Sequence, residues 1–289
     1  MSDNFTGRWL VSEYVYNPDG TFVGIIHQHR HLEPRDDGRL RVIQRMQTPP
    51  ELNDHAMGGF AGEWTFDLIR QGVVRQYHGP DVIGSGMPYG ESAIIGQGIW
   101  TRFGHNFISF ALMPTPQRQI TGGKFFNAGH MIANIIGIAY PEVTDAPDHW
   151  AEFKGTQFPA NIDTQWVGEA ALYAVTGKLK IENVVTRTSD DQTVTETYAN
   201  GQMFMLDHQP SGDGLHDLRG TLTMPGGTAQ QPLYGKSKRY GWLQESVLYT
   251  PQSTRIDTME FLDNDSGLLL LLRQWFQRGV LHHVEIITL

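Results

Sequence analysis

The feature that most constrains the fold is a succession of short β-rich runs separated by turn residues. Trp9 to Tyr16 is rich in Val, Tyr and Trp and stops at Asn17-Pro18-Asp19-Gly20. Leu40 to Gln47 alternates apolar with charged or polar residues. Runs of this kind, bounded by Pro, Asp and Gly, are typical of antiparallel hairpins. Similar runs follow along the chain at Thr21 to Leu32, Glu63 to Gln71, Val73 to His78, Ile99 to Met113, Gly122 to Phe126 and Ala133 to Tyr140. The sequence therefore predicts an all-β protein.

Stretches with the period of an α-helix are almost absent. One short candidate is Ala146 to Lys154, where Asp145 can cap the first turn, Pro147 suits it and Gly155 can end the helix. Strand-like runs resume beyond it. We therefore predict a β domain over 1–145, a linker with this helix over 146–160, and a second β domain over 161–289.

The second half of the chain repeats features of the first. Trp166 to Tyr173 resembles Trp9 to Tyr16, because each run carries Trp, Glu and Tyr in that order and precedes a turn with Gly. Phe107 to Gln117 and Trp242 to Gln252 are apolar strands that each end in Thr-Pro-Gln. These parallels favour two antiparallel barrel or half-barrel domains in tandem, with chance similarity between β-meanders as the alternative.

Composition excludes several classes of function. The formal net charge of the 289 residues is −9 and the 22 basic residues are scattered, so we expect no nucleic-acid partner and no membrane partner. The absence of cysteine removes disulfides, thiolate metal sites and thiol nucleophiles. No secretory signal and no long apolar run is visible, which leads us to expect a cytoplasmic protein. Motifs of the common hydrolases, zinc proteases and dinucleotide-binding enzymes are missing as well.

Gly7-Arg8-Trp9, at the start of the first strand, resembles the G-x-W motif that opens lipocalin and other calycin barrels. The resemblance extends to the order of strands and turns in both halves, although the second half has Thr164-Gln165-Trp166 in the corresponding place. It implies closed, calycin-like barrels. An antiparallel barrel of this kind has no open edge, and its interior can hold one small ligand. No ligand-binding residue is carried over from the family.

The most specific chemical pattern is the run His27-Gln28-His29-Arg30-His31-Leu32-Glu33. Residues two apart on a strand share a face, so the three histidines and Glu33 are expected to point the same way. They can line a polar cavity, lie on the surface, or bind a divalent metal through His27, His29 and Glu33. The spacing of this last set resembles the first metal motif of cupins. The counterpart of the second cupin motif, Gly220 to Gly227, is followed by Gln230 where a cupin has His.

Two further features bear on a site. Glu13 and Glu169 recur at matching places early in each half. Each carboxylate can be exposed on its strand or buried, and a buried carboxylate has a raised pKa suited to general acid–base catalysis. The glycine-rich stretch Gly84 to Glu91 suggests either a lid over the barrel mouth or a long hairpin loop.

Together these features predict a protein that binds a small apolar or aromatic molecule in the first barrel, with the second barrel as support. Isomerase, cyclase or lyase chemistry without a cofactor is expected to use His29, His31, Glu13 and His78. Ligand contacts are expected from His27, Tyr14, Trp100 and His130. A metalloenzyme is the first alternative, and a structural or partner-binding β protein is the second. A homodimer is also considered.

Overall fold

We describe the protein from a computed structural model that covers residues 4–143, 150, 164–190, 192–212, 214–227, 229–263 and 267–289. The chain divides into two compact units, Met1–Lys154 and Gly155–Leu289, and each is described by itself. The helix expected over Ala146 to Lys154 lies outside the described residues, except for Trp150. No helix in these ranges is long and apolar enough to cross a membrane.

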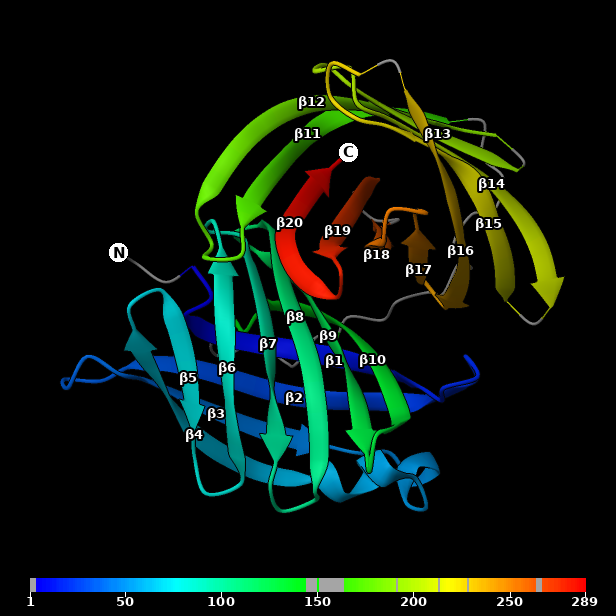
Figure 1. The fold of residues 1–289 in the computed structure, drawn as a ribbon. Coiled ribbons are helices and arrows are strands. Elements are labelled where there is room, and N and C mark those ends of the chain that lie inside the picture. Colours follow the sequence, from blue (N-terminus) through cyan, green and yellow to red (C-terminus); the bar gives the residue numbers. More distant parts are fainter. Residues whose placement is uncertain are drawn as a thin grey trace. The chain divides into compact units, whose positions relative to one another are not determined.

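The first unit is a closed barrel of ten antiparallel strands (Figure 1). Each strand pairs with the next along the chain, and β10 returns to pair with β1, so that Val11 lies opposite Ala139. Two short 3₁₀ helices, η1 (Pro50–Leu52) and η2 (Ala56–Phe60), follow β3 and bury Leu52, Met57 and Phe60 against the core. The strands are β1 (Gly7–Tyr16), β2 (Phe22–Pro34), β3 (Leu40–Gln47), β4 (Gly62–Gln71), β5 (Val74–His78), β6 (Val82–Tyr89), β7 (Ala93–Trp100), β8 (His105–Thr115), β9 (Arg118–Asn127) and β10 (His130–Pro141).

The second unit is a closed barrel with the same connectivity. Its last strand pairs with its first, and Leu172 lies opposite Glu285. The strands are β11 (Thr164–Ala174), β12 (Leu179–Ser189), β13 (Thr193–Tyr198), β14 (Met203–Gly212), β15 (Leu215–Thr223), β16 (Gln230–Tyr240), β17 (Leu243–Tyr249), β18 (Thr254–Asp263), β19 (Leu268–Gln277) and β20 (Val280–Thr288). The predicted all-β fold with two barrels in tandem is confirmed.

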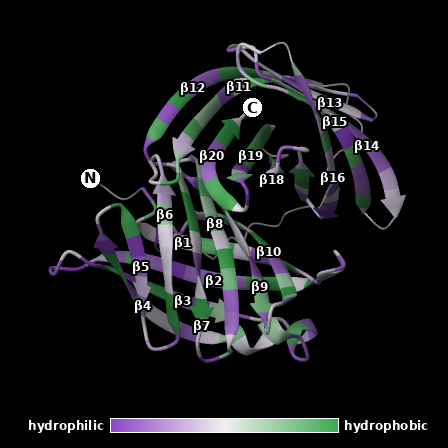
Figure 2. Cartoon of the chain, viewed as in Figure 1, coloured by the Kyte–Doolittle hydropathy of each residue, from purple (hydrophilic) through white to green (hydrophobic). Residues whose placement is uncertain are grey.

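Hydrophobic and hydrophilic residues alternate along many of the strands (Figure 2). Because neighbouring residues of a strand point to opposite faces, this alternation determines which side chains fill each barrel. On β2, Ile26 and Gln28 are almost fully buried, at 1% and 0% exposure, and Ile26 and Leu32 belong to the core of the first barrel. Since neighbouring residues point to opposite faces, His27, His29 and His31 lie on the outside. A shift of pairing by one residue would exchange the two faces, so the position of Ile26 in the core fixes the orientation of the histidines.

The first strands of the two barrels share an irregularity in register. On β1 the pairing with β2 shifts between Val15 and Tyr16, and on β11 the pairing with β12 shifts between Leu172 and Tyr173. Aligned on these tyrosines, Glu13 corresponds to Ala170. The expectation that Glu13 and Glu169 occupy matching places is therefore wrong, because Glu169 lies one residue before the position that matches Glu13. Because a step of one residue changes the face, Glu169 is exposed while Glu13 points into its barrel.

Two local expectations also need correction. Ile99 to Met113 is not one strand, because a turn with Gly104 at φ +67° separates β7 from β8. Most of Gly84 to Glu91 is neither lid nor loop, since it belongs to β6 and pairs with β7. Its glycines serve packing: a Cβ at Gly86 would collide with the hydroxyl of Tyr77. The absence of side chains there makes room for the Tyr77 ring inside the barrel.

Candidate functional site

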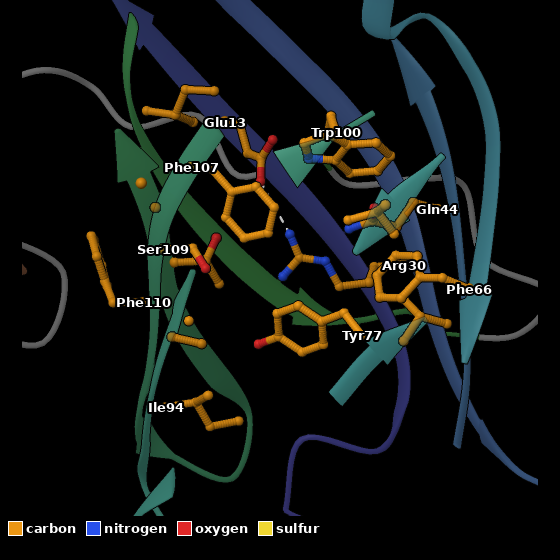
Figure 3. A pocket seen from close by; sticks show the side chains of 18 of the residues that line it. Glu13, Arg30, Gln44, Phe66, Tyr77, Ile94, Trp100, Phe107, Ser109 and Phe110 are labelled. Atoms are coloured by element: carbon orange, nitrogen blue, oxygen red, sulfur yellow. Dashed lines mark hydrogen bonds and ion pairs between the residues drawn. The ribbon is translucent and has the colours of Figure 1, made fainter. Parts of the chain in front are cut away.

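The first barrel encloses a cavity of about 210 Å³ (Figure 3). Most of its lining is apolar, and Trp100, Phe107 and Phe66 supply large aromatic surfaces. A cavity of roughly 150 Å³ lined by apolar side chains is able to bind benzene. Drug-sized ligands occupy pockets of about 300–1,000 Å³. The space in the first barrel therefore matches a molecule of one or two rings.

An ion pair between β1 and β2 projects into this cavity. Arg30 Nη2 donates to Glu13 Oε1 over 3.1 Å, and the two side chains are only 15% and 13% exposed. Burial raises the pKa of Glu13, although the charge of Arg30 and hydrogen bonds from Gln28 and Arg30 oppose the shift. Burial likewise lowers the pKa of Arg30, against the attraction of Glu13. The pair thus places a desolvated carboxylate and guanidinium beside an apolar space.

Tyr77 adds a hydroxyl group to the same cavity. Burial raises the pKa of Tyr77 to about 12, so the hydroxyl is protonated at neutral pH and can donate a hydrogen bond. The Tyr77 side chain comes from β5 and lies near Arg30 (Figure 3).

Three buried polar atoms of the cavity wall lack a hydrogen-bond partner within the described ranges. They are Gln44 Oε1, Gln119 Nε2 and Thr121 Oγ1, on residues that are 9%, 2% and 3% exposed. An unsatisfied buried polar group costs about 1–3 kcal/mol. Such groups are rare in native structures and call for an explanation. The surrounding protein covers these three atoms almost completely, so a ligand or water in the cavity would reach them only after their side chains rotate.

The histidine strand β2 presents its imidazoles on the other face of the sheet. His29 Nδ1 lies 3.2 Å from Glu142 Oε1, and His31 Nε2 lies 2.9 Å from Glu142 Oε2. His27 Nδ1 lies 3.3 Å from Ser12 Oγ. The prediction that these histidines line the cavity together with Glu13 is corrected by this placement. Arg30, between His29 and His31 in the sequence, occupies the inner face instead.

The remaining predicted site residues are dispersed. Trp100 lines the cavity as expected of a ligand contact. Tyr14 is buried on the outer face, with its ring centroid 6.2 Å from that of Phe22. His78 and His130 are exposed and do not line the cavity.

Glu33 is exposed and is not a member of the cluster that His29 and His31 form with Glu142, which corrects the predicted metal set of His27, His29 and Glu33. Sequence reasoning missed Arg30, Tyr77 and Glu142. Arg30 shares a strand face with Ile26 and Leu32, but Ile25 lies on the opposite face, so the pattern of apolar residues did not decide which face points inward. No local sequence pattern pointed to Glu142, since 113 residues separate it from His29.

The second barrel has a polar interior of a different kind. Five of the buried charged residues described in this barrel form one network, in which Arg187 pairs with Glu196 and Glu260, and Arg273 pairs with Glu196 and Glu285. Glu285 also helps to line a pocket of about 490 Å³. The five charged side chains of the network are 3–7% exposed, which indicates a role in holding the barrel together.

Comparisons with known proteins bear on the fold. The chain matches no family model and no curated protein. It is similar in structure to a protein of unknown function from the DUF3598 family of Nostoc punctiforme, with a TM-score of 0.56, 10% identity, and coverage of 100% of this chain and 98% of that one. This likeness supports the tandem barrel fold alone.

Two other solved structures align over most of the chain but with low scores. The transferrin binding protein B of Haemophilus parasuis gives a TM-score of 0.25 at 8% identity, covering 97% of this chain and 75% of that one. A Rhodopseudomonas blastica porin mutant gives 0.22 at 9% identity, covering 97% of each chain. Neither carries an argument about this protein.

Proposed function

We propose that the first barrel binds a small, mainly apolar molecule with an aromatic ring and one or two hydrogen-bonding groups. The observation that carries this proposal is the position of the Glu13–Arg30 pair and of Tyr77 on the wall of a cavity whose lining is otherwise largely apolar. Small-molecule sites have this composition: an apolar lining for affinity, with a few placed polar groups for orientation. The aromatic rings of the wall suit stacked or edge-to-face contact with a ring of the ligand.

Filling the cavity is expected to weaken ligand binding. The probe is naphthol, whose two rings and single hydroxyl suit a cavity of about 210 Å³. Ala111→Leu adds bulk to the cavity wall on β8, and we expect it to weaken naphthol binding at least about tenfold, because an overfilled site excludes the ring. The measurement is titration calorimetry or naphthol fluorescence on the full chain.

Asn106→Leu is the matched control, since Asn106 lies on the same strand but is exposed and outside the cavity. It should bind naphthol like the wild type. Absence of saturable naphthol binding to the wild type, or equal binding by both variants, would count against the proposal.

A second candidate function is proton transfer in this cavity, as in isomerase, cyclase or lyase chemistry without a cofactor. The specific observation is Glu13, whose carboxyl faces the ligand space with a raised pKa. A general base works best when its pKa lies near the working pH, and exclusion of water leaves the carboxylate more reactive. Tyr77 can donate a hydrogen bond to a developing negative charge.

A nitrobenzisoxazole is a suitable probe of such catalysis. A carboxylate removes the ring proton bound to carbon, the nitrogen–oxygen bond breaks, and a coloured cyanophenolate forms. We expect a saturable rate that rises with pH through the raised pKa of Glu13 and is lost in Glu13→Gln. Glu63→Gln, at a carboxylate that is 53% exposed, is the control and should leave the rate unchanged. Equal rates in Glu13→Gln and wild type would refute catalysis by Glu13.

A further inference from the structure

A second site lies outside the cavity of the first barrel, where two histidines of β2 meet the carboxylate of Glu142. We propose that His29, His31 and Glu142 bind a divalent transition-metal ion, with zinc as the ion of best fit. The three side chains offer one ligand atom each, and these atoms all lie within 4.8 Å of one another. Two imidazoles and one carboxylate are a common ligand set for zinc and for other first-row metals.

The distances already approach those of a coordinated ion. The carboxylate oxygens of Glu142 lie 3.2 Å from His29 Nδ1 and 2.9 Å from His31 Nε2. Neighbouring ligand atoms on a tetrahedral zinc are about 3.3 Å apart, given bonds of about 2.0–2.2 Å. Small side-chain rotations would therefore admit an ion between the three groups. Three protein ligands would leave a fourth position for water.

The backbone holds the three ligands in place. His29 and His31 lie two residues apart on β2, so both imidazoles leave the same face of the sheet. Glu142 follows β10, and its amide N–H donates to the carbonyl of Arg8 over 2.9 Å, which continues the pairing of β10 with β1. The three positions thus belong to one pair of hydrogen-bonded ladders rather than to independent loops.

Neighbouring side chains shield the cluster from most of the solvent. The Trp150 ring lies 4.6 Å from the His27 ring and 5.2 Å from the His29 ring, measured between centroids. The side chains of His29, His31 and Glu142 are 19%, 12% and 20% exposed.

Two arginines on the neighbouring strands β1 and β3 are the cross-strand partners of the two histidine ligands. Arg45, opposite His29, has its charge offset by Glu63 at 2.7 Å. Arg8, opposite His31, is exposed, so its charge is screened by water.

The nature of the ligands decides which metal is favoured. Magnesium and calcium prefer sites made only of oxygen, so two imidazoles disfavour them. Imidazole nitrogen suits zinc, copper, nickel and iron. The three ligands include no sulfur atom, which disfavours soft copper(I).

The test uses the full chain, freed of metal with a chelator and dialysed. Zinc is titrated by calorimetry, and cobalt(II) is titrated as a zinc substitute by its visible spectrum. We expect one equivalent to bind. His31→Ala and Glu142→Gln are each expected to weaken zinc affinity by more than about 100-fold, since even outer residues of metal sites account for 10–100-fold. Unfolding curves without metal verify that each variant is folded, and zinc should raise the unfolding temperature of the wild type but not of His31→Ala or Glu142→Gln.

His130→Ala is the matched control, because this exposed histidine lies outside the cluster and should leave zinc binding unchanged. If Glu142 serves only as a hydrogen-bond partner of two histidines, the wild type will bind no stoichiometric zinc or cobalt. That result overturns the proposal, as does equal zinc affinity in wild type, His31→Ala and Glu142→Gln. Naphthol binding is measured independently, so the two sites can fail separately.

Discussion

Replacing Arg273 with Met is expected to destabilise the second barrel by about 3–5 kcal/mol, the loss typical when one partner of a buried ion pair is removed. The guanidinium of Arg273 is 3% exposed and donates to Glu196 at 2.9 Å, to Glu285 at 3.2 Å, to the Tyr198 hydroxyl at 2.9 Å and to Thr258 at 3.2 Å. Without it, two carboxylates would remain buried beside an apolar side chain.

The charges of this network explain why one arginine matters so much. The two arginines lower the pKa of Glu196 against the effect of burial, whereas burial raises the pKa of Glu285. Arg187 and Arg273 together balance most of the buried negative charge of Glu196, Glu260 and Glu285. Removal of Arg273 breaks this balance in the interior, where water cannot compensate.

Urea denaturation followed by far-ultraviolet circular dichroism provides the measurement. Arg219→Met is the control, because Arg219 is exposed on β15 and its loss should change stability by less than about 0.5 kcal/mol. The double variant Arg273→Met with Glu196→Gln should lose less than the sum of the two single variants, since it leaves fewer unpaired charges. Identical unfolding midpoints for Arg273→Met and wild type would show that the network does not stabilise the barrel.

Local sequence was enough to predict the fold. Leu40 to Gln47, chosen for its alternation and for the turn before it, matches β3 at both ends. The Asn17 to Gly20 turn separates β1 from β2 as predicted, with Gly20 at φ +93°. Alternation and turn chemistry act over a few residues, and an antiparallel meander needs little else to define its strand order.

The site was harder to predict, because the sequence of β2 alone does not determine which of its two faces points into the barrel. Ile25 and Ile26 lie on opposite faces, so hydrophobicity alone favoured neither. What decides is the packing between β2 and the adjacent strand β1, where Arg30 reaches Glu13 and a charged residue becomes acceptable inside. Glu142 reaches the histidines only through the pairing of the last strand with the first. Both facts depend on contacts between distant residues.

The Glu13–Arg30 pair leads to the second large prediction. Glu13→Ala is expected to destabilise the first barrel by about 3 kcal/mol, because it leaves the Arg30 guanidinium buried without its carboxylate. The comparison is Glu63→Ala, which breaks the pair of Glu63 with Arg45. Those side chains are 53% and 60% exposed, and loss of such a surface pair should cost less than about 1 kcal/mol. Urea midpoints of the two variants should therefore differ clearly.

The same variant also tests whether the cavity accepts a ligand next to Arg30. In Glu13→Ala, the carboxylate of naphthoate can occupy the space of the missing side chain and pair with the guanidinium. We therefore expect the affinity for naphthoate relative to naphthol to rise at least about tenfold over wild type, since a charge-assisted hydrogen bond is worth about 1.5–3 kcal/mol.

Naphthoate should also restore part of the lost stability, because a ligand that binds only the folded protein stabilises it in proportion to its occupancy. Glu63→Ala should show neither effect. If naphthoate left the urea midpoint of Glu13→Ala unchanged while naphthol still bound, ligands would enter the cavity without reaching Arg30. The ion pair would then be a structural part of the barrel wall rather than part of the binding site.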